Sequence, residues 1–243
     1  MTRIVKLLAS TVSVAESSVL SDLGVDILDV KNPAEGSLGA QPPWVVREIV
    51  QFAEHHGVAV SAAIGDLSFQ PGTAALAADS VARLGVSFVK VGLYDLRSFD
   101  EATSLLRAVR AAIKMVDDRI AVVAAGYGDY PRFDGLSPAN LIRAAAATGC
   151  QITLLDTAIK DGASLLDAIS FPELEAFVQE ARHQNLQVAL AGSLRREHLA
   201  SLAKLKPDFI GVRGALCSGN VRSQSIDPAV ASEFVRAVRV VFS

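Results

Sequence analysis

Short apolar runs alternate with longer amphipathic segments along the whole chain. A strand is expected where β-branched and apolar residues cluster, and a helix where Ala, Leu, Glu and Arg recur with a 3.6-residue period. This pattern predicts eight strands, at Ile4–Ala9, Val25–Val30, Val58–Ala63, Phe88–Gly92, Ile120–Ala125, Ile152–Asp156, Gln187–Ala191 and Phe209–Val212. A helix is predicted after each strand, at Val14–Leu23, Pro43–His55, Thr73–Leu84, Phe99–Val116, Pro138–Ala147, Pro172–Asn185, Arg196–Leu205 and Pro228–Phe242.

Several of these helices carry boundary signals. Ser13 with Glu16, and Ser98 with Glu101, match the capping box, in which the serine and the glutamate bond to each other's backbone N–H. Glycines follow four of the helices, at Gly24, Gly57, Gly85 and Gly149. A glycine just past a helix end favours the left-handed conformation that stops the helix.

Eight strand–helix units without a Pro- or Ser-rich linker between them favour one α/β domain over residues 1–243, folded as a closed (β/α)₈ TIM barrel. No GxGxxG motif follows the first strand, which argues against a dinucleotide-binding sheet. Two segments are longer than a minimal connection, Asn32–Gln41 and Gly126–Leu136. Both follow strands, so we expect them on the rim where barrels bind their ligands.

Composition excludes several classes of partner. The formal net charge of −3 and the absence of a basic stripe argue against nucleic acid. No apolar run reaches the roughly 18 residues of a membrane span, so we expect a soluble, cytoplasmic protein with no membrane partner.

Cys150 and Cys217 lack the spacing of a zinc site or a disulfide framework, and buried thiols are expected. The alanine-rich stretches Ala74–Ala82 and Ala144–Ala147 fit either barrel packing or a homo-oligomer interface, and both alternatives stay open.

Lysines and aspartates recur at three predicted strand exits. The second strand ends in Asp29 followed by Lys31, the fourth contains Lys90, and the sixth ends in Asp156 followed by Lys160. An unpaired ammonium is costly to bury, so a lysine within an apolar strand is expected to reach a polar cavity. Because the strands of a barrel end at one rim, the sequence predicts that these five side chains converge there.

Such a cluster suits carbonyl chemistry. A lysine beside other cations loses its proton more readily and attacks an aldehyde or ketone to form a Schiff base. Lys90 and Lys160 are expected to lower the proton affinity of Lys31 in this way, while Asp29 and Asp156 orient the ammonium groups and relay protons. The alternative is a structural Lys–Asp network that closes the mouth of the barrel.

Glycine-bearing loops follow the last two strands. Ala191-Gly192-Ser193-Leu194-Arg195 comes after the seventh strand and Gly211-Val212-Arg213-Gly214-Ala215 after the eighth. Barrel enzymes often bind phosphate at these two exits through backbone N–H groups. We therefore expect a phosphate site at Gly192, Ser193, Arg213 and Gly214, the alternative being ordinary turns with exposed arginines. Together with a reactive lysine, this site indicates phosphosugar chemistry.

The chain resembles the (5-formylfuran-3-yl)methyl phosphate synthase family of methanofuran biosynthesis. The resemblance is carried by Asp29-Val30-Lys31-Asn32-Pro33, Glu35-Gly36-Ser37-Leu38-Gly39, Lys90-Val91-Gly92, Leu155-Asp156-Thr157-Ala158-Ile159-Lys160-Asp161-Gly162 and Leu190-Ala191-Gly192-Ser193-Leu194. It implies a barrel enzyme, a carbon–oxygen lyase acting on phosphates, that condenses two glyceraldehyde 3-phosphate molecules and releases phosphate and water. By the same resemblance Lys31 is the Schiff-base lysine, Lys90 is the proton acceptor, and Asp29, Asp156 and Lys160 surround them.

No cofactor and no metal are expected, because iminium, enamine and proton-transfer steps need only lysines and acids. Two alternatives remain open. The first is another class I aldolase or phosphosugar isomerase on the same barrel, which would share the lysine and the phosphate site. The second is a noncatalytic regulator that binds a phosphorylated metabolite without turnover. The sequence does not indicate a role for the segments 126–136 and 220–226.

Overall fold

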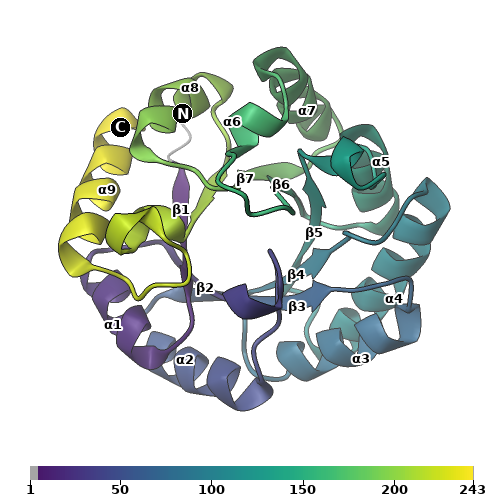
Figure 1. Ribbon diagram of the computed structural model, residues 1–243. Helices are drawn as coiled ribbons and strands as arrows, with labels where there is room; N and C mark the ends of the chain where they lie inside the picture. The colour runs from purple at the N-terminus through teal and green to yellow at the C-terminus, as the bar shows by residue number, and fades with distance from the viewer. Residues whose placement is uncertain (1–4, 243) are drawn as a thin grey trace.

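The computed structural model describes residues 5–242 as a closed barrel of eight parallel strands with helices around it (Figure 1). The strands are β1 Lys6–Thr11, β2 Ile27–Val30, β3 Ala59–Asp66, β4 Phe88–Gly92, β5 Ala121–Tyr127, β6 Ile152–Asp156, β7 Gln187–Leu190 and β8 Phe209–Val212. Each strand pairs with the next along the chain, and β8 pairs with β1, where Lys6 lies opposite Phe209. The predicted fold class is confirmed, whereas the predicted start of the first strand, Ile4, lies outside the described residues.

The helices pack around the outside of this ring. They are α1 Val14–Asp22, α2 Pro43–His56, α3 Pro71–Ala82, α4 Phe99–Val116, α5 Pro138–Thr148, α6 Leu165–Ala168, α7 Phe171–His183, α8 Leu199–Leu205 and α9 Pro228–Val241. The short helix α6 was not predicted from the sequence. In Figure 1 it lies beside β7, between α7 and α8.

Three strands run further than their sequence patterns predict. β1 continues beyond Ala9 and ends at Thr11. β3 continues beyond Ala63 through an irregularity in its pairing with β4 and ends at Asp66. β5 continues beyond Ala125 and ends at Tyr127. An irregularity of this kind changes the direction in which the last side chains of a strand point. As a result Asp66 and Tyr127 belong to the rim of the barrel.

Alternation along the strands separates two apolar regions. A large cluster that includes Leu7, Leu28 and Val89 fills the space between the strands and the helices. A smaller cluster that includes Leu8, Ile27 and other alternate strand residues fills the barrel interior. Because side chains alternate across a strand, the positions two residues beyond interior residues also face inward. This alternation brings Asp29, two residues after Ile27, into the barrel.

The helix boundaries follow the predicted signals with one difference. Ser98 and Glu101 form the predicted capping box at α4, and all four helix-end glycines have positive φ. At α1, Ser13 caps the backbone N–H of Glu16 as predicted. The Glu16 carboxylate, however, accepts from Val12 N and pairs with Arg213 instead of completing the box.

The alanine-rich helices pack inside the molecule. Ala74 and Ala78 of α3 and Ala144 and Ala145 of α5 are fully buried, and α4 contacts both helices. These alanines therefore fit the first of the two alternatives, packing within the barrel. Cys150 and Cys217 are free and buried, as expected. Among residues 5–242, no helix has the length and apolar character needed to cross a membrane.

Candidate active site

Asp29 and Lys90 form an ion pair inside the barrel. The Lys90 Nζ lies 2.5 Å from Asp29 Oδ1 and 2.6 Å from Oδ2, and Ser10 Oγ donates to Oδ2 at 3.0 Å. Both charged side chains are 2% exposed. Burial raises the pKa of Asp29, but the charges of Lys90 and Lys31 and the hydrogen bonds more than offset it, so the pKa lies below its ordinary value. The opposite charges of Asp29 and Lys90 thus neutralise each other inside the barrel.

Asp156 and Lys160 form a second pair at the exit of β6. Lys160 Nζ donates to Asp156 Oδ1 at 2.7 Å and to Thr157 Oγ1 at 3.1 Å. Thr157 N also donates to Asp156 Oδ1, at 2.7 Å. Burial raises the pKa of Asp156, yet Lys160 and Lys31 outweigh it and hold the pKa at about 2. Asp156 is therefore an ionised carboxylate at any working pH.

Lys31 follows β2 and is buried without a paired carboxylate. Within residues 5–242 its ammonium forms no ion pair and no hydrogen bond. Burial is the main cause that lowers the pKa of Lys31 to about 8, and Lys90 and Lys160 lower it further while Asp156 and Asp29 raise it. The two cations thus act in the direction expected from the sequence, and burial, which the sequence did not indicate, has the largest effect.

This shift changes how much free amine is present. A pKa of about 8 leaves about a tenth of the Lys31 amine neutral at pH 7, whereas the ordinary value of 10.5 leaves less than about one part in a thousand. Only the neutral amine attacks a carbonyl. Of the three clustered lysines, Lys31 is the one without a carboxylate in contact, so it is the nucleophile that the geometry favours.

A pocket of about 250 Å³ opens beside Lys31. Its walls come from the exits of β2, β6, β7 and β8: Lys31, Asp156, Lys160, Gly162, Ala191, Gly192, Ser193, Leu194, Arg195, Gly211, Val212, Arg213, Gly214, Ala215, Asn220, Val221 and Arg222. Two of the predicted lysines, Lys31 and Lys160, thus meet the predicted phosphate loops at one cavity. Asp29 and Lys90 are not part of its wall and act on Lys31 from deeper in the barrel.

Gly192 lets the loop after β7 approach the loop after β6. Its φ is +103°, and a Cβ there would lie 2.8 Å from Thr157 N. Leu165 N donates to the Gly192 carbonyl at 2.9 Å, which ties α6 to the same loop. A side chain at this position would push the two loops apart. The glycine therefore fixes the pocket wall next to Asp156.

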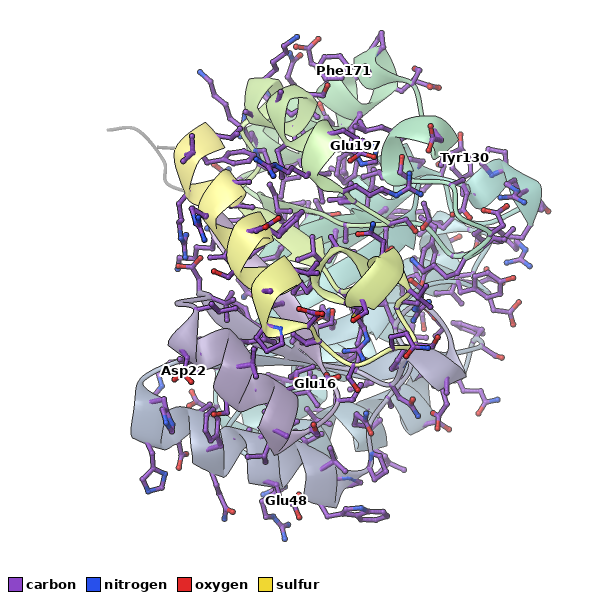
Figure 2. The ribbon with its side chains drawn as sticks, turned by 60° about the vertical axis from the view of Figure 1, so that its left-hand side comes forward. Glu16, Asp22, Glu48, Tyr130, Phe171 and Glu197 are labelled. Carbon is purple, nitrogen blue, oxygen red and sulfur yellow. The ribbon has the colours of Figure 1, made fainter. Side chains whose placement is uncertain are left out.

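The Arg213 side chain is engaged in contacts within the protein. Its guanidinium is buried and bonded to both Glu16 carboxylate oxygens at 2.9 and 3.2 Å. The same group donates to the carbonyls of Ser10, Arg222 and Gln224. Figure 2 shows Glu16 beneath the segment that leads into α9. Arg213 therefore joins this segment to β1 and α1, and only its backbone remains available to the phosphate site.

Arg222 is a pocket residue that the sequence did not reveal. It belongs to the segment 220–226, is half-buried, and donates to the Gly36 carbonyl at 2.8 Å. Burial lowers the pKa of its guanidinium, while Asp156 and Asp66 raise it and Arg213 lowers it. An arginine keeps its charge despite such shifts and offers a planar fork of donors to an anion. The feature of the sequence that could have indicated Arg222 is a basic residue in the long polar loop after β8.

Asp66 and Tyr127 also come to this rim without having been predicted. The Tyr127 hydroxyl donates to Asp66 Oδ1, and Leu38 N donates to Oδ2 at 3.1 Å. A Cβ on Gly92 would lie 2.1 Å from Asp66 Oδ1, so the glycine of the Lys90-Val91-Gly92 motif makes room for this carboxyl. Burial raises the pKa of Asp66.

Among the described residues, no group of three or more His, Cys, Asp or Glu side chains is arranged to hold a metal ion.

Comparison with known proteins shows the same family over most of the chain. A family model described as 4-HFC-P synthase matches residues 7–235. A protein of Archaeoglobus fulgidus named (5-formylfuran-3-yl)methyl phosphate synthase is 46% identical over 233 residues, which is 96% of this chain and 99% of the relative. A Methanothermobacter thermautotrophicus protein of the same name is 44% identical over 217 residues, which is 89% of this chain and 91% of the relative.

Solved structures are similar in fold. KGPDC from Streptococcus mutans superposes with a TM-score of 0.66 at 11% identity, covering 99% of this chain and 100% of the other. At this identity the likeness shows the barrel fold alone. The sequence relatives, and not the structural neighbours, therefore bear on activity.

Proposed function

Because the chain belongs to the 4-HFC-P synthase family, we propose that it condenses two glyceraldehyde 3-phosphate molecules into (5-formylfuran-3-yl)methyl phosphate through a Schiff base on Lys31. One phosphate and two waters leave, which balances the atoms. The observation that carries the mechanism is Lys31 itself, a buried amine with a pKa of about 8 on the wall of the pocket. The names of the relatives support the choice of product.

The first step forms the covalent intermediate. The neutral Lys31 amine attacks the triose carbonyl carbon, and loss of water from the carbinolamine gives an iminium. The iminium withdraws electrons, so the neighbouring carbon loses a proton more easily and becomes an enamine that attacks the second triose. On the same pocket wall as Lys31, the ionised Asp156 is proposed to accept hydrogen bonds from substrate hydroxyl groups, and Lys160 to donate a proton to a leaving oxygen.

Lys90 is proposed as a proton acceptor that works together with Asp29. An ammonium accepts no proton, so Lys90 accepts one only when its amine is neutral, and Asp29 Oδ2, 2.6 Å away, then stabilises the ammonium that forms. Ser10 donates to the same Asp29 oxygen. The two residues thus act together in proton transfer.

The phosphate site is proposed at the backbone of Gly192-Ser193 and Arg213-Gly214, with the side chain of Arg222 beside it. All five residues line the pocket with Lys31. Backbone N–H groups at loop exits and an arginine fork are the groups that commonly bind phosphate. A structure with bound phosphate or sulfate should place the anion here, and an anion found only at the loop after β2 would contradict the assignment.

Replacing Arg222 with glutamine is expected to raise KM for glyceraldehyde 3-phosphate by about 10- to 100-fold, because a charged hydrogen bond to phosphate contributes about 1.5–3 kcal/mol. Steady-state kinetics would measure the change. Arg119→Gln is the matched control, since Arg119 is exposed and precedes β5, at the opposite end of the barrel. Equal KM values in Arg222→Gln and the unmodified protein would exclude Arg222 from the phosphate site.

The function itself is tested by incubation with glyceraldehyde 3-phosphate alone. We expect an ultraviolet-absorbing furan aldehyde phosphate, identified by its mass, together with free inorganic phosphate. An aldol or an isomerised triose as the final product would instead support another class I aldolase or a phosphosugar isomerase. Binding without turnover and without borohydride labelling would support a regulator. The activated amine at Lys31 favours an enzyme over a regulator.

A further inference from the structure

Asp66 differs from Asp29 and Asp156 in how it is held. Asp29 and Asp156 each contact a lysine. Within residues 5–242, Asp66 lies at ion-pair distance from no lysine or arginine, and its hydrogen-bond donors are the Tyr127 hydroxyl and the Leu38 peptide N–H. A carboxylate held by neutral donors keeps more of its basicity than one that is neutralised by an ammonium.

We propose that Asp66 is a proton-transfer residue of the reaction and that Tyr127 is its positioning residue. The proposal rests on the Schiff-base function proposed above and adds a group that the sequence motifs do not contain. The position of Asp66 supports it: Gly36 packs against its carboxyl, and the Gly36 carbonyl accepts a hydrogen bond of 2.8 Å from Arg222, a residue of the pocket wall. Lys31 and Asp156, on the same wall, also influence the pKa of Asp66.

The carboxyl of Asp66 is fixed in place by close packing. Gly92 and Gly36 both lie so near that a Cβ on either would come within 2.1 and 3.1 Å of its oxygens. Tyr127 is 2% exposed, and its ring packs edge-on against Tyr94 and Phe133 at centroid distances of 5.9 and 6.1 Å. A carboxyl that cannot turn away is held ready for proton transfer, which requires an aligned donor and acceptor.

The charges that surround Asp66 come from several elements. Burial has the largest effect and raises its pKa, the hydrogen bonds from Tyr127 and Leu38 lower it, Asp156 raises it and Lys31 lowers it. Arg222 faces it from the segment before α9. The pKa of Tyr127 is raised well above its ordinary value, so its hydroxyl stays protonated and remains a donor. The pKa of Asp66 thus lies above its ordinary value, which makes its carboxylate a stronger base than that of an exposed aspartate.

The assigned step is the removal of a carbon-bound proton. With the triose bound to Lys31 as an iminium, the Asp66 carboxylate takes a proton from the adjacent carbon. The C–H electron pair becomes the C=C bond of the enamine, and the C=N electron pair moves onto the Lys31 nitrogen. The proton on Asp66 then returns to substrate or solvent, so no oxidant or further reactant is needed.

The experiment combines borohydride trapping with deuterium exchange. In D₂O, Asp66→Asn is expected to form the Lys31 adduct within a few-fold of the unmodified protein, while deuterium incorporation next to the triose carbonyl and furan formation both fall about 10²- to 10⁴-fold. Exchange at the unmodified rate in folded Asp66→Asn would overturn the proposal. If the unmodified protein itself gives neither adduct nor furan, the proposed function fails first, which is a distinguishable result.

Tyr127→Phe provides a test even if Asp66→Asn does not fold. The hydroxyl lowers the pKa of Asp66, so its loss raises that pKa. A base is active when unprotonated, and the acid limb of the kcat/KM profile should therefore move to higher pH. Tyr94→Phe is the matched control, because Tyr94 packs in the same aromatic cluster and its hydroxyl contacts no carboxylate among the described residues. An acid limb that stays in place in Tyr127→Phe would refute the positioning role.

Discussion

Lys31→Arg is expected to fold normally and to lose more than about 10³-fold in turnover, together with all borohydride trapping by triose phosphate. The substitution keeps a positive charge beside Asp156 and Asp29 but removes the amine that attacks the carbonyl. Circular dichroism would confirm folding, and peptide mapping of the reduced adduct would locate the reactive lysine. Lys204→Arg, at an exposed position on α8, is the control and should leave both properties unchanged.

The same amine sets the pH dependence of adduct formation in the unmodified protein. Because the neutral form reacts and the pKa of Lys31 is about 8, the trapping rate at limiting triose phosphate should rise with pH and reach half its maximum near pH 8. A midpoint near the ordinary value of 10.5 would show that burial does not activate Lys31. An adduct on Lys90 or Lys160 in the unmodified protein would overturn the assignment.

Lys90→Met is expected to destabilise the fold by about 3–5 kcal/mol, because it leaves the Asp29 carboxylate buried without its partner. Turnover should be abolished or strongly slowed, whereas some trappable adduct at Lys31 should remain, since Lys90 transfers protons and does not bind the substrate covalently. Urea denaturation and borohydride labelling measure the two effects separately. Loss of the adduct in a variant that remains folded would contradict this division of roles.

The stability loss in Lys90→Met should depend on pH in a defined direction. In the unmodified protein Asp29 has a lowered pKa, so it contributes stability above its ordinary value of 3.8 and loses that contribution as the pH falls through the folded pKa. Without Lys90 the buried carboxylate has a raised pKa, and protonation relieves the penalty. The difference in unfolding free energy should therefore shrink as the pH is lowered. The double variant Asp29→Asn/Lys90→Met should recover part of the stability at neutral pH.

The fold was largely predictable because its signals are local. Apolar runs and glycines mark where strands begin and helices end, and the strands at Phe88–Gly92 and Ile152–Asp156 have the predicted bounds. Period-two alternation also brings Asp29 into the barrel from sequence alone. Such features depend on neighbours along the chain, which a sequence displays directly.

The unpredicted part of the site depends on contacts between distant segments. Glu16 and Arg213 are 197 residues apart, and no local pattern indicates that they pair. Asp66 follows Gly65, and this pair of residues is typical of a turn, whereas the structure continues the strand through an irregularity in its pairing. The activation of Lys31 was predicted from neighbouring cations, but burial, which only the closed barrel provides, is its main cause.

Closure of the barrel between β8 and β1 has a consequence for protein synthesis. Lys6 pairs with Phe209, and Arg213 reaches back to Glu16, so the ring cannot close until the ribosome has released most of the chain. Before that moment Lys31 is exposed to water, where a lysine is almost fully protonated at neutral pH. In a nascent chain Lys31 therefore reacts with metabolic aldehydes no faster than any exposed lysine. The finished enzyme acquires its nucleophile in the same event that encloses it.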